Sequence, residues 1–163
     1  MHTLDLATTE KLLQNAGGFR FDCTACGNCC HGPGLVWFSV EELNNIYDYL
    51  ELHKTARSAL QAILIQGWQN GLAYHSAQEH CHFLNASGRC QIYPVRPLQC
   101  RTFPFWSSNF ASPYALGELQ KNCPGCNDPQ ARQYTALAIV RRCNQTTRQF
   151  HHNQDRSDKA HDL

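Results

Sequence analysis

The fold of this chain is decided by a short stretch near its N-terminus, Cys23-Thr24-Ala25-Cys26-Gly27-Asn28-Cys29-Cys30. Two successive Cys-x-x-Cys steps, from Cys23 to Cys26 and from Cys26 to Cys29, are followed directly by Cys30. At this spacing one tight turn presents two sulfurs to a single ion. Three cysteines at the same repeat are also typical of proteins that hold an iron–sulfur cluster. The stretch therefore predicts half of a metal site, and later parts of the chain are expected to supply the other half.

A second block of cysteines follows downstream, so that nine cysteines in all are candidate metal ligands: Cys23, Cys26, Cys29, Cys30, Cys81, Cys90, Cys100, Cys123 and Cys126. Thiolates suit zinc or iron–sulfur clusters, and no cluster of carboxylates favours a harder ion. These ligands suffice for two four-cysteine zinc centres, or for one [4Fe–4S] cluster and one such zinc centre. Because adjacent Cys29 and Cys30 point in different directions, they are candidates for separate centres, or one of them lies outside the ligand set.

Other residues near the cysteines have weaker assignments. Cys143 fits no spacing pattern and is read as a small buried apolar residue. His31 and His82 flank candidate ligands, but each is read as a neighbour or surface group rather than a ligand. Three arginines lie close to cysteines in the sequence: Arg89, Arg96 and Arg101. They are candidates for balancing the negative charge of a four-thiolate zinc centre, with plain surface positions as the alternative.

Composition excludes several classes of function. The 14 Lys and Arg residues nearly balance the 13 Asp and Glu residues, for a net charge of +1. No basic field therefore indicates a nucleic acid or an anionic membrane as partner, and no apolar run is long enough to cross a bilayer. The length of 163 residues predicts one domain, over residues 1–150, followed by a disordered polar tail over residues 151–163.

The N-terminal segment has neither the basic nor the apolar region of a secretion signal, so a reducing cytoplasm is expected. In that compartment clustered cysteines are typical of metal or redox sites rather than of disulfides. A disulfide framework is the alternative, but the adjacent pair Cys29 and Cys30 fits such a framework poorly.

Hydrophobic patterning predicts an α+β fold, in which a small metal-stapled, loop-rich cysteine core with short strands packs against a helical insertion and a long C-terminal helix. Helices are expected over residues 8–15, 39–50, 55–66 and 128–150. Ser39 and Glu42 have the spacing of a capping box at the start of the second helix. Short strands are expected over residues 19–21, 35–38, 72–74 and 81–84, and an extended aromatic segment over residues 100–106.

Three motifs occur in an order typical of one known family. They are Phe21-Asp22-Cys23-Thr24-Ala25-Cys26-Gly27-Asn28-Cys29-Cys30, then Cys81-His82-Phe83-Leu84 with Gly88-Arg89-Cys90-Gln91-Ile92-Tyr93, then Arg96-Pro97-Leu98-Gln99-Cys100-Arg101-Thr102-Phe103-Pro104. Over residues 19–126 the chain resembles the CxxCxxCC cysteine-cluster proteins, described as chelating zinc or iron. The resemblance implies metal binding through these cysteines and leaves the metal open.

A more distant relation is flagellin lysine N-methylase, a larger enzyme that uses S-adenosylmethionine. This chain is much shorter and has no glycine-rich nucleotide loop after a strand. The leading hypothesis is a metal-binding protein that chelates zinc or iron. The alternatives are an iron–sulfur redox or accessory module and a methylase-like enzyme, with a thiol–disulfide oxidoreductase as a weaker one. Catalytic residues, the protein partner and the oligomeric state stay unassigned.

Overall fold

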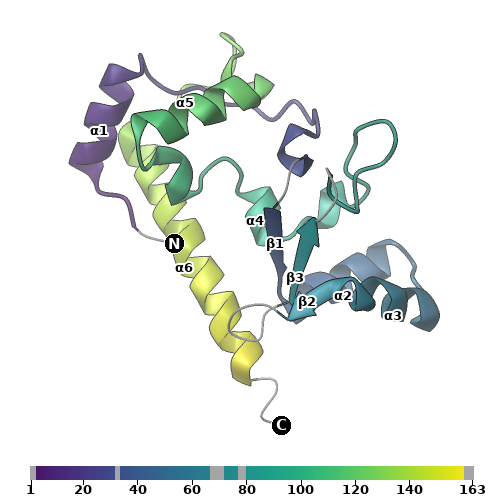
Figure 1. Cartoon of the computed structure of the whole chain (residues 1–163). Helices are drawn as coiled ribbons and strands as arrows, with labels where there is room; N and C mark the ends of the chain where they lie inside the picture. The colour runs from purple at the N-terminus through teal and green to yellow at the C-terminus, as the bar shows by residue number, and fades with distance from the viewer. Residues whose placement is uncertain (1–2, 32–33, 67–71, 77–79, 160–163) are drawn as a thin grey trace. The chain divides into compact units, whose positions relative to one another are not determined.

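The computed structural model describes residues 3–31, 34–66, 72–76 and 80–159, and its elements are labelled in Figure 1. Contacts along the chain define two compact units. The first unit consists of residues 1–29 and 102–149, and the second unit of residues 30–101 and 150–163. The boundary falls between the adjacent cysteines Cys29 and Cys30. A single domain over residues 1–150 stays a prediction.

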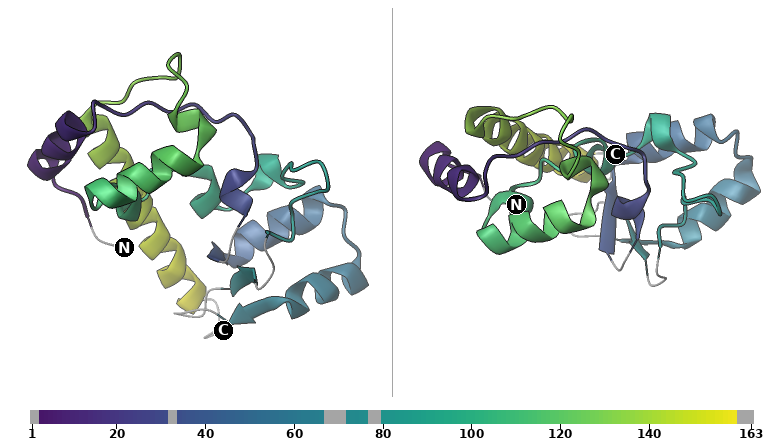
Figure 2. Two further views of the ribbon diagram at one scale, coloured as in Figure 1. Left: turned by 45° about the horizontal axis from the view of Figure 1, so that its top comes forward. Right: turned by 90° about the horizontal axis from the view of Figure 1, so that it is seen from above.

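The first unit is mainly helical. Its elements are α1 (Leu6–Asn15), α5 (Pro113–Asn122), the start of α6 (Ala136–Lys159) and two short 3-10 helices, Ser107–Phe110 and Pro124–Cys126. Helix α1 begins at Asp5, whose carboxylate accepts a hydrogen bond from the Thr8 amide at 3.0 Å. Figure 2 shows α1, α5 and the first turns of α6 side by side within this unit.

An aromatic cluster forms the core of the first unit. The Phe19 ring, 1% exposed, contacts the Phe110 ring edge-on at a centroid distance of 5.1 Å, and Phe21 meets Phe105 in the same way at 6.1 Å. Phe19 and Phe21 lie in the segment that leads into the cysteine stretch. Burial of these rings therefore fixes the point from which the stretch starts.

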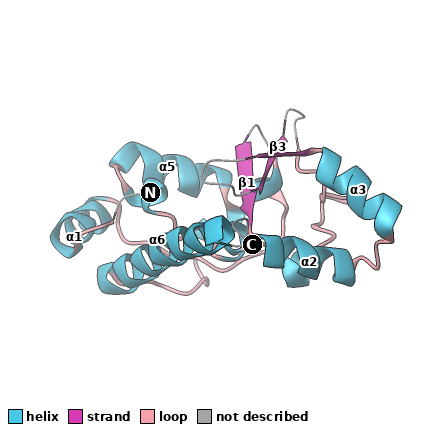
Figure 3. Ribbon diagram, turned by 90° about the horizontal axis from the view of Figure 1, so that it is seen from below, coloured by secondary structure: helices cyan, strands magenta, loops and turns pink. Residues whose placement is uncertain are grey.

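The second unit contains a three-stranded antiparallel sheet in the order β1-β3-β2. Its strands are β1 (Gly34–Phe38), β2 (Leu64–Gln66) and β3 (Leu72–Ser76), and its helices are α2 (Val40–Tyr49), α3 (Lys54–Ala62) and α4 (Leu98–Arg101), with a 3-10 turn over Tyr93–Val95. Figure 3 shows the strands in magenta, with α3 leading directly into the sheet. The predicted α+β class is thereby confirmed.

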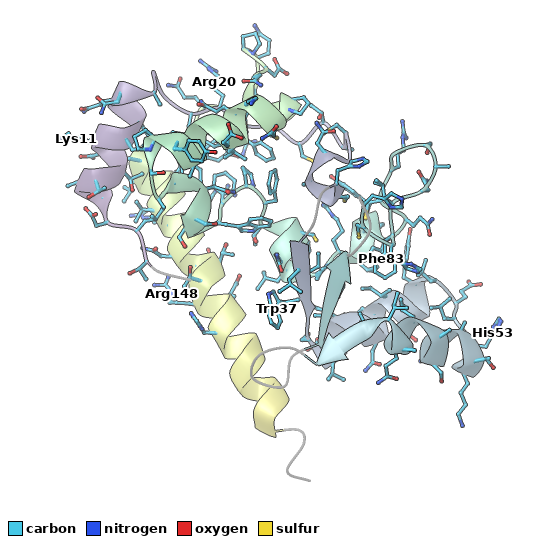
Figure 4. The ribbon with its side chains drawn as sticks, in the orientation of Figure 1. Lys11, Arg20, Trp37, His53, Phe83 and Arg148 are labelled. Carbon is cyan, nitrogen blue, oxygen red and sulfur yellow. The ribbon has the colours of Figure 1, made fainter. Side chains whose placement is uncertain are left out.

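The core of the second unit brings α2 together with the segment that carries Cys81 and Cys90. Ile46 of α2 is fully buried, and Phe83, labelled in Figure 4, is 4% exposed in the same cluster. The predicted capping box is confirmed, because Ser39 Oγ accepts from the Glu42 amide at 3.1 Å and Glu42 Oε2 accepts from the Ser39 amide at 2.9 Å. Glu42 also accepts from the Leu98 amide at 2.7 Å, so one carboxylate joins α2 to α4.

Several predicted elements were wrong in type or extent. Residues 64–66, predicted as the end of a helix, form β2, because pairing with β3 overrides their helical pattern. Residues 81–84 form a turn with a single bridge from Leu84 to Cys90 rather than a strand. Cys100 lies in α4 and not in an extended segment. Helix α5 was not predicted, although Ser112 and Pro113 provide its N-cap and first residue.

The last helix also differs from the prediction. It begins at Ala136 rather than near Asp128, because the intervening residues pair with the segment before the cysteine stretch. The Phe21 amide donates to the Arg132 carbonyl at 2.9 Å, and the Tyr134 amide donates to the Phe19 carbonyl at 2.9 Å. The helix continues to Lys159, past the predicted end near residue 150, since this segment has no Gly or Pro to stop it. Within the described residues, no helix combines the length and apolar character needed to cross a membrane.

Candidate metal centres

The first unit holds five of the nine candidate ligands, Cys23, Cys26, Cys29, Cys123 and Cys126. Two hydrogen bonds hold the loop that contains Cys23, Cys26 and Cys29 against the turn that carries Cys123 and Cys126. At the start of the loop the Asp22 amide donates to the Gly125 carbonyl at 3.1 Å. Near its end Asn28 Nδ2 donates to the Asn122 carbonyl at 3.1 Å. Both ends of the loop are therefore tied to the segment around Cys123 and Cys126.

Backbone geometry explains why these two segments approach so closely. A Cβ atom built on Gly125 would overlap the carbonyl oxygen of Asp22, so only glycine fits at this position. Within the loop, Ala25 has φ 53° and Gly27 has φ 78°. These left-handed conformations turn the chain tightly after Cys23 and again after Cys26.

The thiols of the first unit differ in burial. Cys123 and Cys126 are 8% and 6% exposed, whereas Cys23, Cys26 and Cys29 are exposed. Burial, with a smaller contribution from the neighbouring Cys123 thiol, raises the pKa of Cys126 well above its usual value of 9.0. A protonated thiol is a poor metal ligand, so a metal ion that binds Cys126 has to displace the proton of this thiol.

The second unit holds the other four candidates, Cys30, Cys81, Cys90 and Cys100. The Cys81 amide donates to the Cys30 carbonyl at 2.7 Å, which places these two residues side by side. A turn at residues 85–88 then brings the chain back to Cys90, which bridges to Leu84. Asn85 Oδ1 stabilises this turn by accepting from the Ser87 amide at 3.0 Å and from the Arg89 amide at 2.9 Å.

A thiol contact joins Cys30 to Cys90. The hydrogen bond from the Cys30 side chain is the largest of the effects that lower the pKa of Cys90 from 9.0 to about 6, with smaller contributions from the Ile92 backbone and from the charge of Arg96. This lowered pKa favours the thiolate form of Cys90. Thiolate is the form that binds metal.

Two of the three arginines named from the sequence lie in one pocket of about 410 Å³ on the α2 side of the second unit, with Glu42 and Asp48. The guanidinium of Arg96 stacks over the Tyr93 ring at 3.5 Å from its centroid, and Nε donates to the Tyr93 carbonyl at 2.8 Å. Arg101 lies 3.6 Å from Glu42 Oε1. The charge of Arg96 acts on one of the cysteines, Cys90.

The remaining candidates have distinct surroundings. Cys143 is fully buried in the aromatic core of the first unit, as predicted, and burial raises its pKa to about 12. The His82 ring packs against Phe83 at 5.3 Å. His31 lies opposite His80 in an antiparallel bridge, a pairing that the sequence did not predict.

The structure thus brings two pairs of candidate thiols together, Cys123 with Cys126 and Cys30 with Cys90. Across the described ranges, no three His, Cys, Asp or Glu side chains gather closely enough to hold one ion. The residues that sequence analysis missed are those that tie the cysteine segments together, Asn28, Asn122 and Gly125. Of these only Gly125 carried a sequence signal, because it lies inside the Cys-Pro-Gly-Cys turn.

Comparison with known proteins finds a family match that spans the cysteine segments. A family model matches residues 22–127 and is described as "CxxCxxCC: Putative zinc- or iron-chelating domain". The matched range begins just before Cys23 and ends just after Cys126, so it contains all nine candidate ligands. No solved structure matches the chain.

Proposed function

This chain belongs to the CxxCxxCC family of zinc- or iron-chelating domains, and we propose that it binds metal through two separate groups of cysteines, one in each unit. The observation that carries the proposal is the division of the candidate ligands by the two units. Five cysteines lie in the first unit and four in the second, so each unit has enough thiols for a complete four-ligand centre.

The first proposed centre is built from two Cys-x-x-Cys turns, one with Cys23 and Cys26 and the other with Cys123 and Cys126. The hydrogen bond from Asp22 to Gly125 holds the two turns against each other. Each turn can present two sulfurs to one ion, which gives the four ligands of a tetrahedral site. Cys29 belongs to the same loop and is the alternative ligand.

The second proposed centre uses Cys30, Cys81, Cys90 and Cys100. The backbone contact between Cys30 and Cys81 and the thiol contact between Cys30 and Cys90 support it. Helix α4 carries Cys100 and is attached to α2 through Glu42. The positive charge of Arg96 acts on Cys90 and partly offsets the negative charge that four thiolates would bring to a divalent ion.

Metal binding in this proposal completes the ligand sets that the fold begins. One pair of thiols meets in each group, Cys123 with Cys126 and Cys30 with Cys90, and a metal ion would draw the remaining thiols of each group into its coordination sphere. Because the thiols must lose their protons, binding releases protons and couples metal affinity to folding. A site filled on all sides by sulfur suits a structural or stored ion.

An iron–sulfur cluster in the first unit is a second candidate, favoured by one observation. Cys23, Cys26 and Cys29 all belong to one loop of one unit, and this repeat is the one with which ferredoxin-type proteins hold three irons of a cluster. A cluster there would add a redox or accessory role to the metal-binding one. The absorption spectrum of the purified protein separates the two candidates, because a zinc centre is colourless.

The test is a count of metal in anaerobically purified protein and in single-cysteine variants. We expect Cys26→Ser to lose the metal of the first centre and to keep that of the second, and Cys90→Ser to show the reverse. Cys143→Ala is the matched control, since it removes a cysteine that lies in neither group. Circular dichroism shows whether each variant stays folded. Loss of all metal in both variants would favour one shared centre, and full metal content in both would contradict the proposal.

A further inference from the structure

Two histidines meet on the surface of the second unit. His31 and His80 are directly opposite each other in an antiparallel bridge, and both are exposed. The hydrogen bond beside them runs from the Cys81 amide to the Cys30 carbonyl, which makes His31 and His80 a non-hydrogen-bonded pair. In such pairs the Cα atoms are closest and the side chains lie together.

The two imidazole rings are in contact. Their centroids are 6.4 Å apart at an interplanar angle of 75°. Zn–N bonds are about 2.0–2.1 Å long. A separation of 6.4 Å between the ring centroids is therefore within reach of one ion bound by a nitrogen of each ring.

A contact with the backbone orients one of the two rings. His80 Nδ1 lies 3.2 Å from the Cys81 carbonyl oxygen. In the neutral tautomer that carries its proton on Nδ1, this nitrogen donates to the carbonyl oxygen, and Nε2 is the nitrogen that can bind a metal ion. Metal-bound histidines in proteins usually donate their second nitrogen to a carbonyl or carboxylate in this way.

We propose that His31 and His80 form a surface site for one divalent first-row transition ion, separate from both cysteine groups. Imidazole nitrogen suits zinc, nickel and copper, and water completes the coordination sphere. In the part of the chain that is described, no third His, Cys, Asp or Glu side chain joins this pair in an ion-binding group. The Cys30 thiol next to His31 is engaged with Cys90. The site therefore depends on two ligands and binds more weakly than a thiolate centre.

The experiment uses the full chain as purified, with Ni²⁺ alone as the probe. Diethyl pyrocarbonate modifies accessible imidazoles, and mass spectrometry of the peptides gives the modification rate at each histidine. We expect Ni²⁺ to slow the modification of both His31 and His80. In His31→Ala, at least about tenfold more Ni²⁺ should be needed to protect His80 from modification. Loss of a metal ligand should lower the metal affinity at least as much as loss of an outer hydrogen bond to a ligand does.

His82→Ala is the matched control, because His82 is a near neighbour whose ring packs on Phe83 instead. In this variant Ni²⁺ should protect His31 and His80 as it does in the wild type. Absence of protection in the wild type, or protection of His80 that is unchanged in His31→Ala, would overturn the proposal. Tightly bound zinc or iron is counted in the same samples. That count tests the cysteine centres independently of the histidine pair.

Discussion

Gly125 and Asp22 meet backbone to backbone, with the Asp22 amide 3.1 Å from the Gly125 carbonyl oxygen and no room for a side chain at position 125. This approach holds the turn with Cys123 and Cys126 against the start of the loop with Cys23 and Cys26. Any substitution that separates the two backbones should therefore affect stability and the first proposed centre together.

Gly125→Ala tests this relationship. The added methyl group must displace the Asp22 carbonyl, and we expect a loss of about 1–3 kcal/mol in the free energy of unfolding, as for other overpacked sites. The metal of the first centre should be lost or bound more weakly, while that of the second is kept. Urea unfolding and elemental analysis provide the two measurements.

Gly117→Ala is the matched control for this substitution. Gly117 lies in the middle of α5, and an added Cβ there meets no atom within 4 Å. Replacing glycine by alanine inside a helix should stabilise the protein by about 0.5–1 kcal/mol. Equal destabilisation by both variants would contradict the steric explanation for Gly125.

Glu42 is expected to make a large contribution to the stability of the second unit. Its carboxylate accepts hydrogen bonds from the Ser39 and Leu98 amides at 2.9 and 2.7 Å, and its side chain is only 12% exposed. Glu42→Ala removes two hydrogen bonds to a charged group, and we expect a loss of about 2–4 kcal/mol in unfolding free energy. Helix α4 loses its attachment, so metal bound with the participation of Cys100 should also be released more readily.

The neighbouring Glu41 provides the comparison for Glu42. It lies in the same first turn of α2 but is exposed. Glu41→Ala should change the unfolding free energy by less than about 0.5 kcal/mol, as is usual for surface substitutions. Denaturant unfolding measures the change in unfolding free energy of both variants. Similar losses of unfolding free energy in Glu41→Ala and Glu42→Ala would refute a specific role for Glu42.

Cys143 should be chemically inert in the folded protein. Burial raises its pKa to about 12, above the usual 9.0, and the thiolate is the form that reacts with iodoacetamide. At pH 9 we expect Cys143 to react far more slowly in the native protein than in the protein unfolded by urea. Because the folded state holds the proton more tightly, the contribution of Cys143 to stability is complete below pH 9.0 and is lost between pH 9.0 and about 12. Peptide mass spectrometry gives the labelling rates, and equal rates in the two states would refute the prediction.

Removal of metal should destabilise the whole chain. A chelator that strips the ion leaves the cysteines in pairs, so we expect a lower midpoint of thermal unfolding and faster proteolysis of the exposed loop around Cys26. Adding back the metal that was found in the purified protein should restore both properties. A midpoint that does not move on complete removal of the metal would show that the ion has no structural role.

Local sequence signals predicted much of the fold. Ser39 and Glu42 gave the start of α2 correctly because a capping box depends only on residues within one turn. The same holds for β1. Elements that depend on distant partners were missed or misread. Residues 64–66 became a strand only through β3, and the start of α6 was displaced because Arg132 and Tyr134 pair with the segment of Phe19 and Phe21.

The candidate site shows the same division between local and distant information. The nine cysteines could be chosen from spacing alone, but their grouping stays a prediction because it depends on contacts such as those from Asp22 to Gly125 and from Cys30 to Cys81. The partner of His31 could not be found from sequence, since His80 lies in a distant part of the chain and no periodic pattern links the two. Burial of Cys143, which the structure confirms, was predicted because this residue fits no ligand spacing and cysteine outside metal sites is usually a small buried apolar residue.

The division of the chain between Cys29 and Cys30 has a consequence for biosynthesis. Residues 30–101 of the second unit are inserted within the sequence of the first. The four cysteines of the second unit are therefore synthesised before Cys123 and Cys126. At about 5–20 residues per second, Cys23, Cys26 and Cys29 wait for several seconds with their partners still unsynthesised. During translation the inner group of thiols is complete first, and the outer loop is the one that needs protection from oxidation or from the wrong ion.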